Sequence, residues 1–197
     1  MYPESIKKVI ESFKLLPGIG EKTAERLAFA VLEIDEDNIS TFSNSIVNLK
    51  KTIKKCKSCN VLTDTEKCNI CDDSLRNRKV LCIVDDSKSV FLFEKMGIYN
   101  GLYHVLDGLI SPIDGITPDD IGLEKLVERI KKEQLEEVII AVTPSIEGET
   151  TALYIKKILE DMDVIISKMA NGIPMGADIE YLDVMTLERA LKDRTEL

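Results

Sequence analysis

Four cysteines close together constrain this chain more than any other feature of its sequence. They form two Cys-x-x-Cys pairs within sixteen residues, Cys56 with Cys59 and Cys68 with Cys71. Each pair can form a tight turn with both sulfurs pointing the same way, so the four thiolates can surround one ion, as in a structural zinc site. Because four thiolates leave no coordination position for water or substrate, we expect Zn²⁺ to stabilise the fold and not to catalyse.

Two disulfides are the alternative use of the four cysteines. They would require an oxidising compartment, which no signal peptide indicates, and they would leave a fifth cysteine, Cys82, without a partner. Cys82 lies in the apolar run 80–84, where we expect a small buried hydrophobic residue. No apolar run approaches the roughly 20 residues of a membrane span, so we expect a cytoplasmic protein without a membrane partner.

Charge is distributed unevenly along the 197 residues, whose formal net charge is −9. Residues 1–79 carry 14 Lys and Arg against 12 Asp and Glu, a net charge of +2. Residues 80–197 carry 12 against 23, a net charge of −11. The first part can therefore contact phosphates locally, whereas the second would repel them and suits a basic protein surface or metal ions.

Apolar spacing in the N-terminal part predicts three amphipathic helices. The first runs from Ser5 to Leu16, the second follows a glycine hairpin at residues 16–20, and the third runs from Ile39 to Ile53. Glycines let the backbone approach a phosphate closely, and the free N–H groups at the start of the next helix bind an anion. Lys22 and Arg26 lie four residues apart and share a face of that helix. The pattern resembles the helix-hairpin-helix motif, which contacts the DNA backbone; a plain helical turn is the alternative.

Four lysines follow one another closely where the third helix is expected to end: Lys50, Lys51, Lys54 and Lys55. Cations at a helix C-terminus interact favourably with the helix dipole, so the cluster needs no ligand to explain it. A contact with DNA explains it equally well, and both interpretations stay open.

From residue 80 onward the pattern is α/β. Helical segments alternate with four apolar runs that predict buried strands: 80–84, 102–106, 138–142 and 164–169. This alternation indicates a parallel sheet covered on both faces, whose ligands gather at the carboxyl ends of the strands. Acidic residues stand at those ends, with Asp85 after the first strand and with Glu147 and Glu149 after the third.

This order of strands and acids resembles a Toprim domain, the catalytic module of bacterial primases and of type IA and II topoisomerases. Those enzymes hold magnesium with an acid after the first strand and an Asp-x-Asp pair after a later one. Asp85 stands in the first position, but Thr143, Pro144 and Ser145 stand in place of the pair. Hydroxyl and proline side chains cannot replace carboxylates as ligands of a hard cation, so the resemblance implies a Toprim-like site without its chemistry.

Taken together, the hairpin-helix, the four-cysteine segment and the Toprim-like domain resemble the RecR family of bacterial recombination mediators over essentially the whole chain. Longer glycine-punctuated stretches carry the same resemblance: 101–106 with 110–116, 147–154 and 172–181. The resemblance implies a protein without catalytic activity that acts in recombinational DNA repair. With RecO and RecF it would help to replace single-strand-binding protein by recombinase at gaps. It also implies a homo-oligomer, a dimer or a ring-shaped tetramer, located in the cytoplasm at the nucleoid.

Carried over position by position, the resemblance implies two binding surfaces. The DNA contacts fall on the hairpin and the helix after it: Gly18, Ile19, Gly20, Lys22 and Arg26. The RecO-binding acidic face falls on Asp85, Glu147 and Glu149, while one acidic family position after the first strand is Ser89 here.

We therefore expect an α+β multidomain fold with four parts. They are a helix-hairpin-helix domain at residues 1–54, a four-cysteine zinc finger at 55–78, a Toprim-like domain with a mainly parallel four-stranded sheet at 79–176, and a helical tail at 177–197. Apolar residues of the tail, among them Leu182 and Leu191, can dock on a neighbouring subunit or on the chain's own sheet.

Other interpretations of these residues stay open. A magnesium-dependent Toprim nuclease or primase-like enzyme would use Asp85 and Glu147 as metal ligands, and a zinc-stapled scaffold would never touch DNA. Glu147 and Glu149 can also simply stabilise the start of a helix near Thr150. His104, the only histidine, is expected to be a core residue and not a ligand. The glycines and proline of residues 172–176 are expected to shape a turn.

Overall fold

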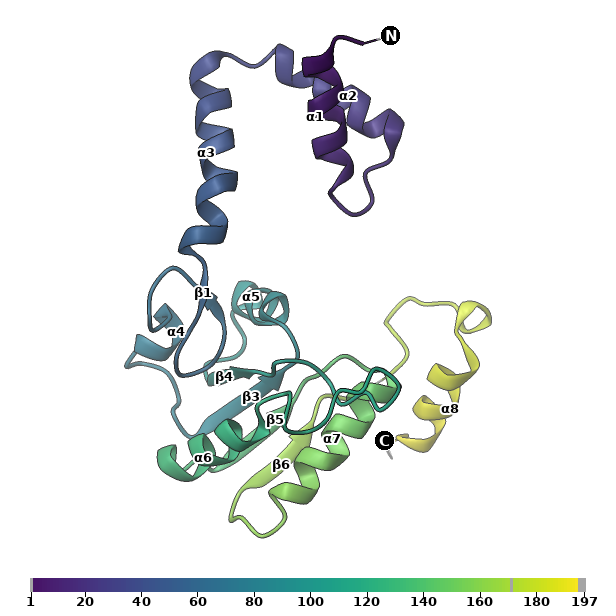
Figure 1. Ribbon diagram of the computed structural model, residues 1–197. Helices are drawn as coiled ribbons and strands as arrows, with labels where there is room; N and C mark the ends of the chain where they lie inside the picture. Colours follow the sequence, from purple (N-terminus) through teal and green to yellow (C-terminus); the bar gives the residue numbers. More distant parts are fainter. Residues whose placement is uncertain (1, 171, 195–197) are drawn as a thin grey trace. The chain divides into compact units, whose positions relative to one another are not determined.

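The structure, a computed structural model, describes residues 2–170 and 172–194. The chain divides into two compact units, and the boundary between them falls between Ile53 and Lys54. The N-terminal unit consists of three helices, α1 (Glu4–Lys14), α2 (Glu21–Leu32) and α3 (Glu36–Thr52) (Figure 1). The predicted helix, hairpin, helix order is confirmed. The third helix begins earlier than the predicted Ile39, because the Asp35 side chain caps it by accepting a hydrogen bond from the Asn38 N–H at 2.9 Å.

A small core joins α1 to α2. Its buried members are Ile10 of α1 with Ala24 and Ala28 of α2. The two alanines let the helices approach closely, and larger apolar side chains close the core from the sides: Ile6, Val9, Phe13 and Ile19. In contrast, α3 contains no buried residue, so its predicted apolar face, including Phe42 and Leu49, is exposed.

The C-terminal unit begins with a small hairpin and continues as an α/β domain. Its strands are β1 (Lys54–Lys55), β2 (Leu62–Thr63), β3 (Val80–Val84), β4 (Leu102–Val105), β5 (Glu137–Ile140) and β6 (Ile165–Lys168). Its helices are α4 (Asn69–Asp72), α5 (Ser87–Met96), α6 (Leu123–Glu133), α7 (Ile146–Ile158), the 3₁₀ helix η1 (Ile179–Tyr181) and α8 (Val184–Lys192).

The large sheet has the order β4-β3-β5-β6, and all of its neighbours are parallel, as predicted. Each crossover carries a helix, and the side chains of the strands divide between two cores. One core, with Leu81, Leu102 and Val138, packs against α6 and α7. The other, with Tyr103 and Val105, contains the four cysteines of the metal-binding segment and Val90 of α5. Both faces of the sheet are therefore covered.

Helix α7 begins earlier than the sequence suggests. The predicted start near Thr150 is wrong, because the Ser145 hydroxyl accepts the Gly148 N–H at 3.1 Å and so caps a helix that begins at Ile146. Glycine is required at 148, since a Cβ there would lie 1.9 Å from the Thr143 carbonyl oxygen. Glu147 and Glu149 consequently lie in the first turn, where acids are favourable to the helix dipole.

The tail forms a helix, as expected, with Asp183 capping α8 through the Thr186 N–H at 2.9 Å. No residue of α8 is buried, and its apolar Val184, Met185 and Leu191 are exposed. The last part of the predicted tail, residues 195–197, lies outside the described residues. Within the described residues, no helix is both long and apolar enough to span a bilayer.

Candidate functional site

The four cysteines of the two Cys-x-x-Cys pairs converge on one point. Their sulfurs all lie within 4.8 Å of one another, and all four residues are buried. Tetrahedral zinc with Zn–S bonds of about 2.3 Å places its sulfurs about 3.8 Å apart, so the cluster has the dimensions of a four-thiolate metal site. The Sγ atoms of Cys59 and Cys68 are 3.5 Å apart, far beyond the ~2.05 Å of a disulfide bond. The cysteines are free thiols, which excludes the disulfide alternative in this structure.

Local backbone geometry prepares the sulfurs to bind a cation. The Cys68 N–H donates to Cys56 Sγ at 3.3 Å, and the Cys71 N–H donates to Cys68 Sγ at 3.4 Å. Asn60 follows the first pair in the left-handed conformation, with φ 61°, which asparagine tolerates, and its N–H returns to the Cys56 carbonyl at 2.9 Å. Each pair thus forms a closed turn with its thiols facing inward.

The pKa values of the clustered thiols indicate a site that a cation would stabilise. Hydrogen bonding with Cys68 and burial raise the pKa of the Cys59 thiol far above its usual range, while hydrogen bonds from Cys59 and Cys71 lower the pKa of Cys68. Burial and the closeness of the four sulfurs disfavour four thiolates without a cation between them. A divalent cation at the centre of the cluster removes this restriction, and soft thiolate donors in a closed tetrahedron select ions such as zinc. Cys82 is not part of the cluster. Burial raises the pKa of its thiol to about 12.

The cysteine segment also covers the open edge of the sheet. Strand β4 is an outer strand, so its outward N–H and C=O groups need partners. The Val105 N–H donates to the Cys59 carbonyl at 2.8 Å, and the Asn60 side chain donates to the Val105 carbonyl at 3.0 Å. From α6, buried Arg129 donates to the Tyr103 carbonyl at 2.7 Å. The metal-binding segment and the sheet are consequently parts of one packed unit.

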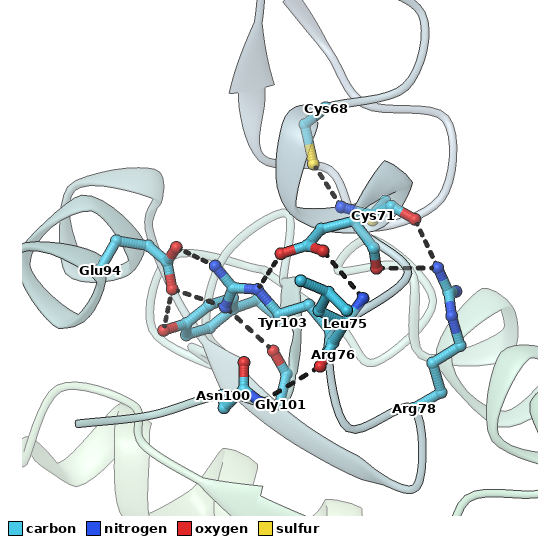
Figure 2. A network of polar contacts seen from close by, with 10 residues as sticks. Cys68, Cys71, Leu75, Arg76, Arg78, Glu94, Asn100, Gly101 and Tyr103 are labelled. Atoms are coloured by element: carbon cyan, nitrogen blue, oxygen red, sulfur yellow. Dashed lines mark hydrogen bonds and ion pairs between the residues drawn. The ribbon is translucent and has the colours of Figure 1, made fainter. Parts of the chain in front are cut away.

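Arg76 ties the end of the cysteine segment to the sheet (Figure 2). Its guanidinium pairs with both carboxylate oxygens of Glu94, Nη1 to Oε1 at 2.8 Å, and donates to the Gly101 carbonyl at 3.3 Å. The Tyr103 hydroxyl donates to the same Glu94 carboxylate at 2.9 Å. Beside it, Arg78 donates to the Cys71 and Asp73 carbonyls at 3.1 and 3.2 Å. These contacts hold α4 and its cysteines against β4 and α5.

Glu94→Gln is expected to lower the free energy of unfolding by about 2 kcal/mol at neutral pH, since it removes charge-assisted hydrogen bonds to Arg76. Arg76 lowers the pKa of Glu94, so this stabilisation is present above the ordinary pKa of about 4.3 and is lost as the pH falls through the lower folded pKa. Urea unfolding at pH 7 and at pH 3 tests this, with exposed Glu160→Gln as the control. An equal loss at both pH values would contradict the assignment.

His104 is a core residue, as predicted. It is 3% exposed, and burial together with nearby Arg129 lowers its pKa to about 4, so the ring is neutral. Its Nδ1 lies 3.5 Å from Arg129 Nη1, while Nε2 has no hydrogen-bond partner among the described residues.

The Toprim-like site at the carboxyl edge of the sheet is closed by a threonine. Asp85 directly follows β3, and its carboxylate accepts hydrogen bonds from the Thr143 N–H at 3.3 Å and from the Thr143 hydroxyl at 2.5 Å. Thr143 occupies the first position of the expected Asp-x-Asp pair. Asp85, the acid that would hold a metal ion, is thus hydrogen-bonded to Thr143, which stands where the Toprim pattern has the next metal-binding carboxylate.

The three acids of the predicted partner-binding face differ in their surroundings. Glu149 forms ion pairs with Lys168 of β6 and with Arg189 of α8, the latter at 3.1 Å. Lys168 and Arg189 contribute to lowering the pKa of Glu149, against an opposing effect of burial. The Glu147 carboxylate forms no hydrogen bond or ion pair with another described residue. Ser89 lies in the first turn of α5, where its N–H donates to Asp86 at 2.9 Å.

The hairpin between α1 and α2 presents backbone and cations to solvent. Gly18 has φ 81°, a conformation that favours glycine, and no atom within 4 Å would meet a Cβ there. Gly20 precedes the first turn of α2, whose N–H groups are available to an anion. Lys22 and Arg26 are exposed, and neither forms an ion pair with another described residue. Ile19 instead packs partly into the small core.

Several residues that belong to no sequence motif hold the site together. Arg76 and Glu94 are 18 residues apart, and Arg129 reaches a carbonyl 26 residues away. No spacing within one helix or strand indicates such contacts. The sequence signal for such a contact is at most an arginine within a segment whose other residues are expected to be buried.

Comparisons with known proteins agree with this architecture. Family models match in three places: "Toprim domain" over residues 79–170, "RecR, helix-hairpin-helix" over 6–50 and "RecR, C-terminal" over 172–195. The chain is 46% identical over 196 residues to "Recombination protein RecR" of Staphylococcus saprophyticus, covering 100% of this chain and 99% of that protein. It is 45% identical, with the same coverage, to the proteins of that name from Staphylococcus aureus strains JH9 and Newman. The chain belongs to the RecR family of recombination proteins.

Proposed function

We propose that this protein is a non-enzymatic recombination mediator in DNA repair. It binds DNA through the hairpin and α2 of its N-terminal unit and a basic partner, RecO, through the acidic edge of its Toprim-like sheet. Acting with RecO and RecF, it assists the loading of recombinase at gaps. The family membership and the opposite net charges of the two parts of the chain support this proposal.

One observation carries the non-enzymatic part of the proposal, namely the bonding of Asp85 to Thr143. Magnesium sites of phosphoryl-transfer enzymes require several carboxylates that are free to coordinate. Here the first acid is already satisfied by a hydroxyl and an N–H group. A carboxylate in this position still contributes negative charge, which suits recognition of a basic protein.

We further propose Zn²⁺ as the metal of the four-cysteine site, held by Cys56, Cys59, Cys68 and Cys71. Its role is structural, because its four ligands leave no open position. The homo-oligomer, a dimer or ring tetramer, and the cytoplasmic location at the nucleoid belong to the same proposal. The proposal also includes the division of the C-terminal part into a zinc finger that begins at residue 55, a Toprim-like domain that begins at 79 and a tail that begins at 177.

Asp85→Lys combined with Glu147→Lys is expected to weaken binding to purified RecO roughly tenfold or more, since it reverses two charges of the acidic edge. Affinity for DNA alone should not fall, because these residues lie outside the N-terminal unit. Surface plasmon resonance with immobilised RecO measures the first effect, and Glu160→Lys combined with Asp163→Lys is the control of equal charge. Unchanged RecO binding by the Asp85 and Glu147 variant would contradict the partner surface.

A further inference from the structure

Helices α6 and α7 pack on one face of the sheet (Figure 1). Residues of both helices line a groove. Its volume is about 520 Å³, and its lining combines acids with apolar residues, which we call its floor. Leu123 and Val127 of α6 line it together with Tyr154 and Ile158 of α7 and with Pro118. Val127 and Ile158 are only partly buried, and Tyr154 is 37% exposed. The groove therefore presents apolar surface to solvent and has room for a few large side chains.

The rim of the groove is acidic. Asp119, Glu124 and Glu128 line it, and no basic residue does. None of the three carboxylates forms a hydrogen bond or ion pair with another described residue. Elsewhere on α6, by contrast, Glu133 pairs with Arg129 at 3.0 Å. Glu124 has a structural explanation in the first turn of α6, where an acid is favourable to the dipole, but Glu128 lies a turn later and Asp119 lies before the helix.

An apolar floor inside an unpaired acidic rim specifies the chemistry of a ligand. The carboxylates of the rim repel the phosphates of a nucleic acid. The same groove of a second copy does not complement this one either, because its carboxylates carry the same charge. A segment that offers apolar anchors to the floor and cations to the rim complements both features.

We propose that this groove binds a short cationic, amphipathic segment of a partner protein. Apolar side chains of the segment occupy the floor formed by Val127, Tyr154 and Ile158. Its Lys and Arg side chains pair with the carboxylates of the rim. The surface is separate from the acidic edge described above, since neither Asp85 nor Glu147 lines the groove. The proposal therefore does not depend on RecO binding at that edge.

The test uses the full-length protein and a fluorescein-labelled synthetic helical peptide with leucines on one face and lysines on the other. A matched peptide with glutamates in place of the lysines is the negative control. Fluorescence polarisation should detect binding of the lysine peptide only. Glu124→Lys combined with Glu128→Lys should weaken this binding roughly tenfold at low salt and reduce its salt dependence.

Two further variants locate the binding. Val127→Asp, which places a charge on the floor, should weaken binding of the same peptide, and circular dichroism checks that it folds. The exposed Glu124 and Glu128 make the charge-reversal variant informative even if Val127→Asp does not fold. Glu25→Lys combined with Glu33→Lys changes the net charge equally in the N-terminal unit and should leave peptide affinity within about twofold.

Several results would overturn the proposal. Equal weakening by the Glu25 and Glu33 control would show attraction to overall charge. Loss of binding in Asp85→Lys with Glu147→Lys, but not in the groove variants, would place the peptide on the acidic edge. Binding of the glutamate peptide would exclude charge complementarity. A change of oligomeric mass on reversal of Glu124 and Glu128, measured by light scattering, would show that a second copy covers the groove.

Discussion

With Zn²⁺ at the four-cysteine site as proposed, Cys68→Ser is expected to abolish metal binding and to lower the free energy of unfolding by roughly 3 kcal/mol or more, because metal binding is coupled to folding. Cys68 is central to the cluster: its sulfur accepts the Cys71 N–H and lies 3.5 Å from Cys59 Sγ. A serine hydroxyl is a poor ligand for zinc. The three remaining thiols would be left buried close together, where burial and their like charges oppose ionisation.

The loss should extend beyond the cysteine segment. Cys59 and Asn60 provide the hydrogen bonds that satisfy the outer edge of β4 at Val105, so loosening the segment also exposes an unpaired strand edge. Metal content by atomic emission and thermal unfolding by circular dichroism measure the two effects. Cys82→Ser, the same change at a buried cysteine outside the cluster, should keep its metal. Full metal content and an unchanged Tm in Cys68→Ser would contradict the account.

Lys22→Ala combined with Arg26→Ala is expected to weaken DNA binding roughly tenfold or more for every sequence alike. Both side chains are exposed beside the Gly18–Gly20 hairpin and form no ion pair among the described residues, so both are available to phosphates. Loss of two phosphate contacts should lower the slope of log K against log salt by about 2 units.

Fluorescence anisotropy with two duplexes of unrelated sequence, measured from low to moderate salt, tests this prediction. Lys156→Ala combined with Lys157→Ala removes the same charge from α7 and is the control. An unchanged salt slope in the Lys22 and Arg26 variant would contradict the assignment. A loss confined to one sequence would contradict it too, since backbone contacts carry no sequence information.

Features that depend on short spacing could be predicted from the sequence. The two cysteine pairs converge on one point because each pair is a local turn. The four apolar runs from residue 80 all form strands, but the prediction that all four are buried is wrong for β6, which lies at the edge of the sheet and contains no buried residue. Helix α5 lies between the first two strands, where the alternation predicts a helix, but its residues carry no clear helical pattern. Only Ser87 and Val90 of its residues are buried, and Phe91, Leu92 and Phe93 follow one another instead of lining one face.

Contacts between distant residues could not be predicted. Asp85 and Thr143 are 58 residues apart, and only the β3-β5 pairing places their strand ends next to each other. The sequence shows that a carboxylate pair is missing, but not that a hydroxyl bonds to the remaining acid. Likewise, the −11 charge of residues 80–197 indicates a basic partner without showing that Lys168 and Arg189 pair with Glu149.

The most direct test of a non-enzymatic mediator is the binding of gapped duplex DNA, with and without RecO, in the presence of magnesium. We predict that the protein binds the DNA, that RecO strengthens this binding, and that Asp85→Lys with Glu147→Lys removes the strengthening while the DNA stays intact on a denaturing gel. Magnesium-dependent strand cleavage that Asp85→Ala abolishes would contradict this prediction and identify an enzyme.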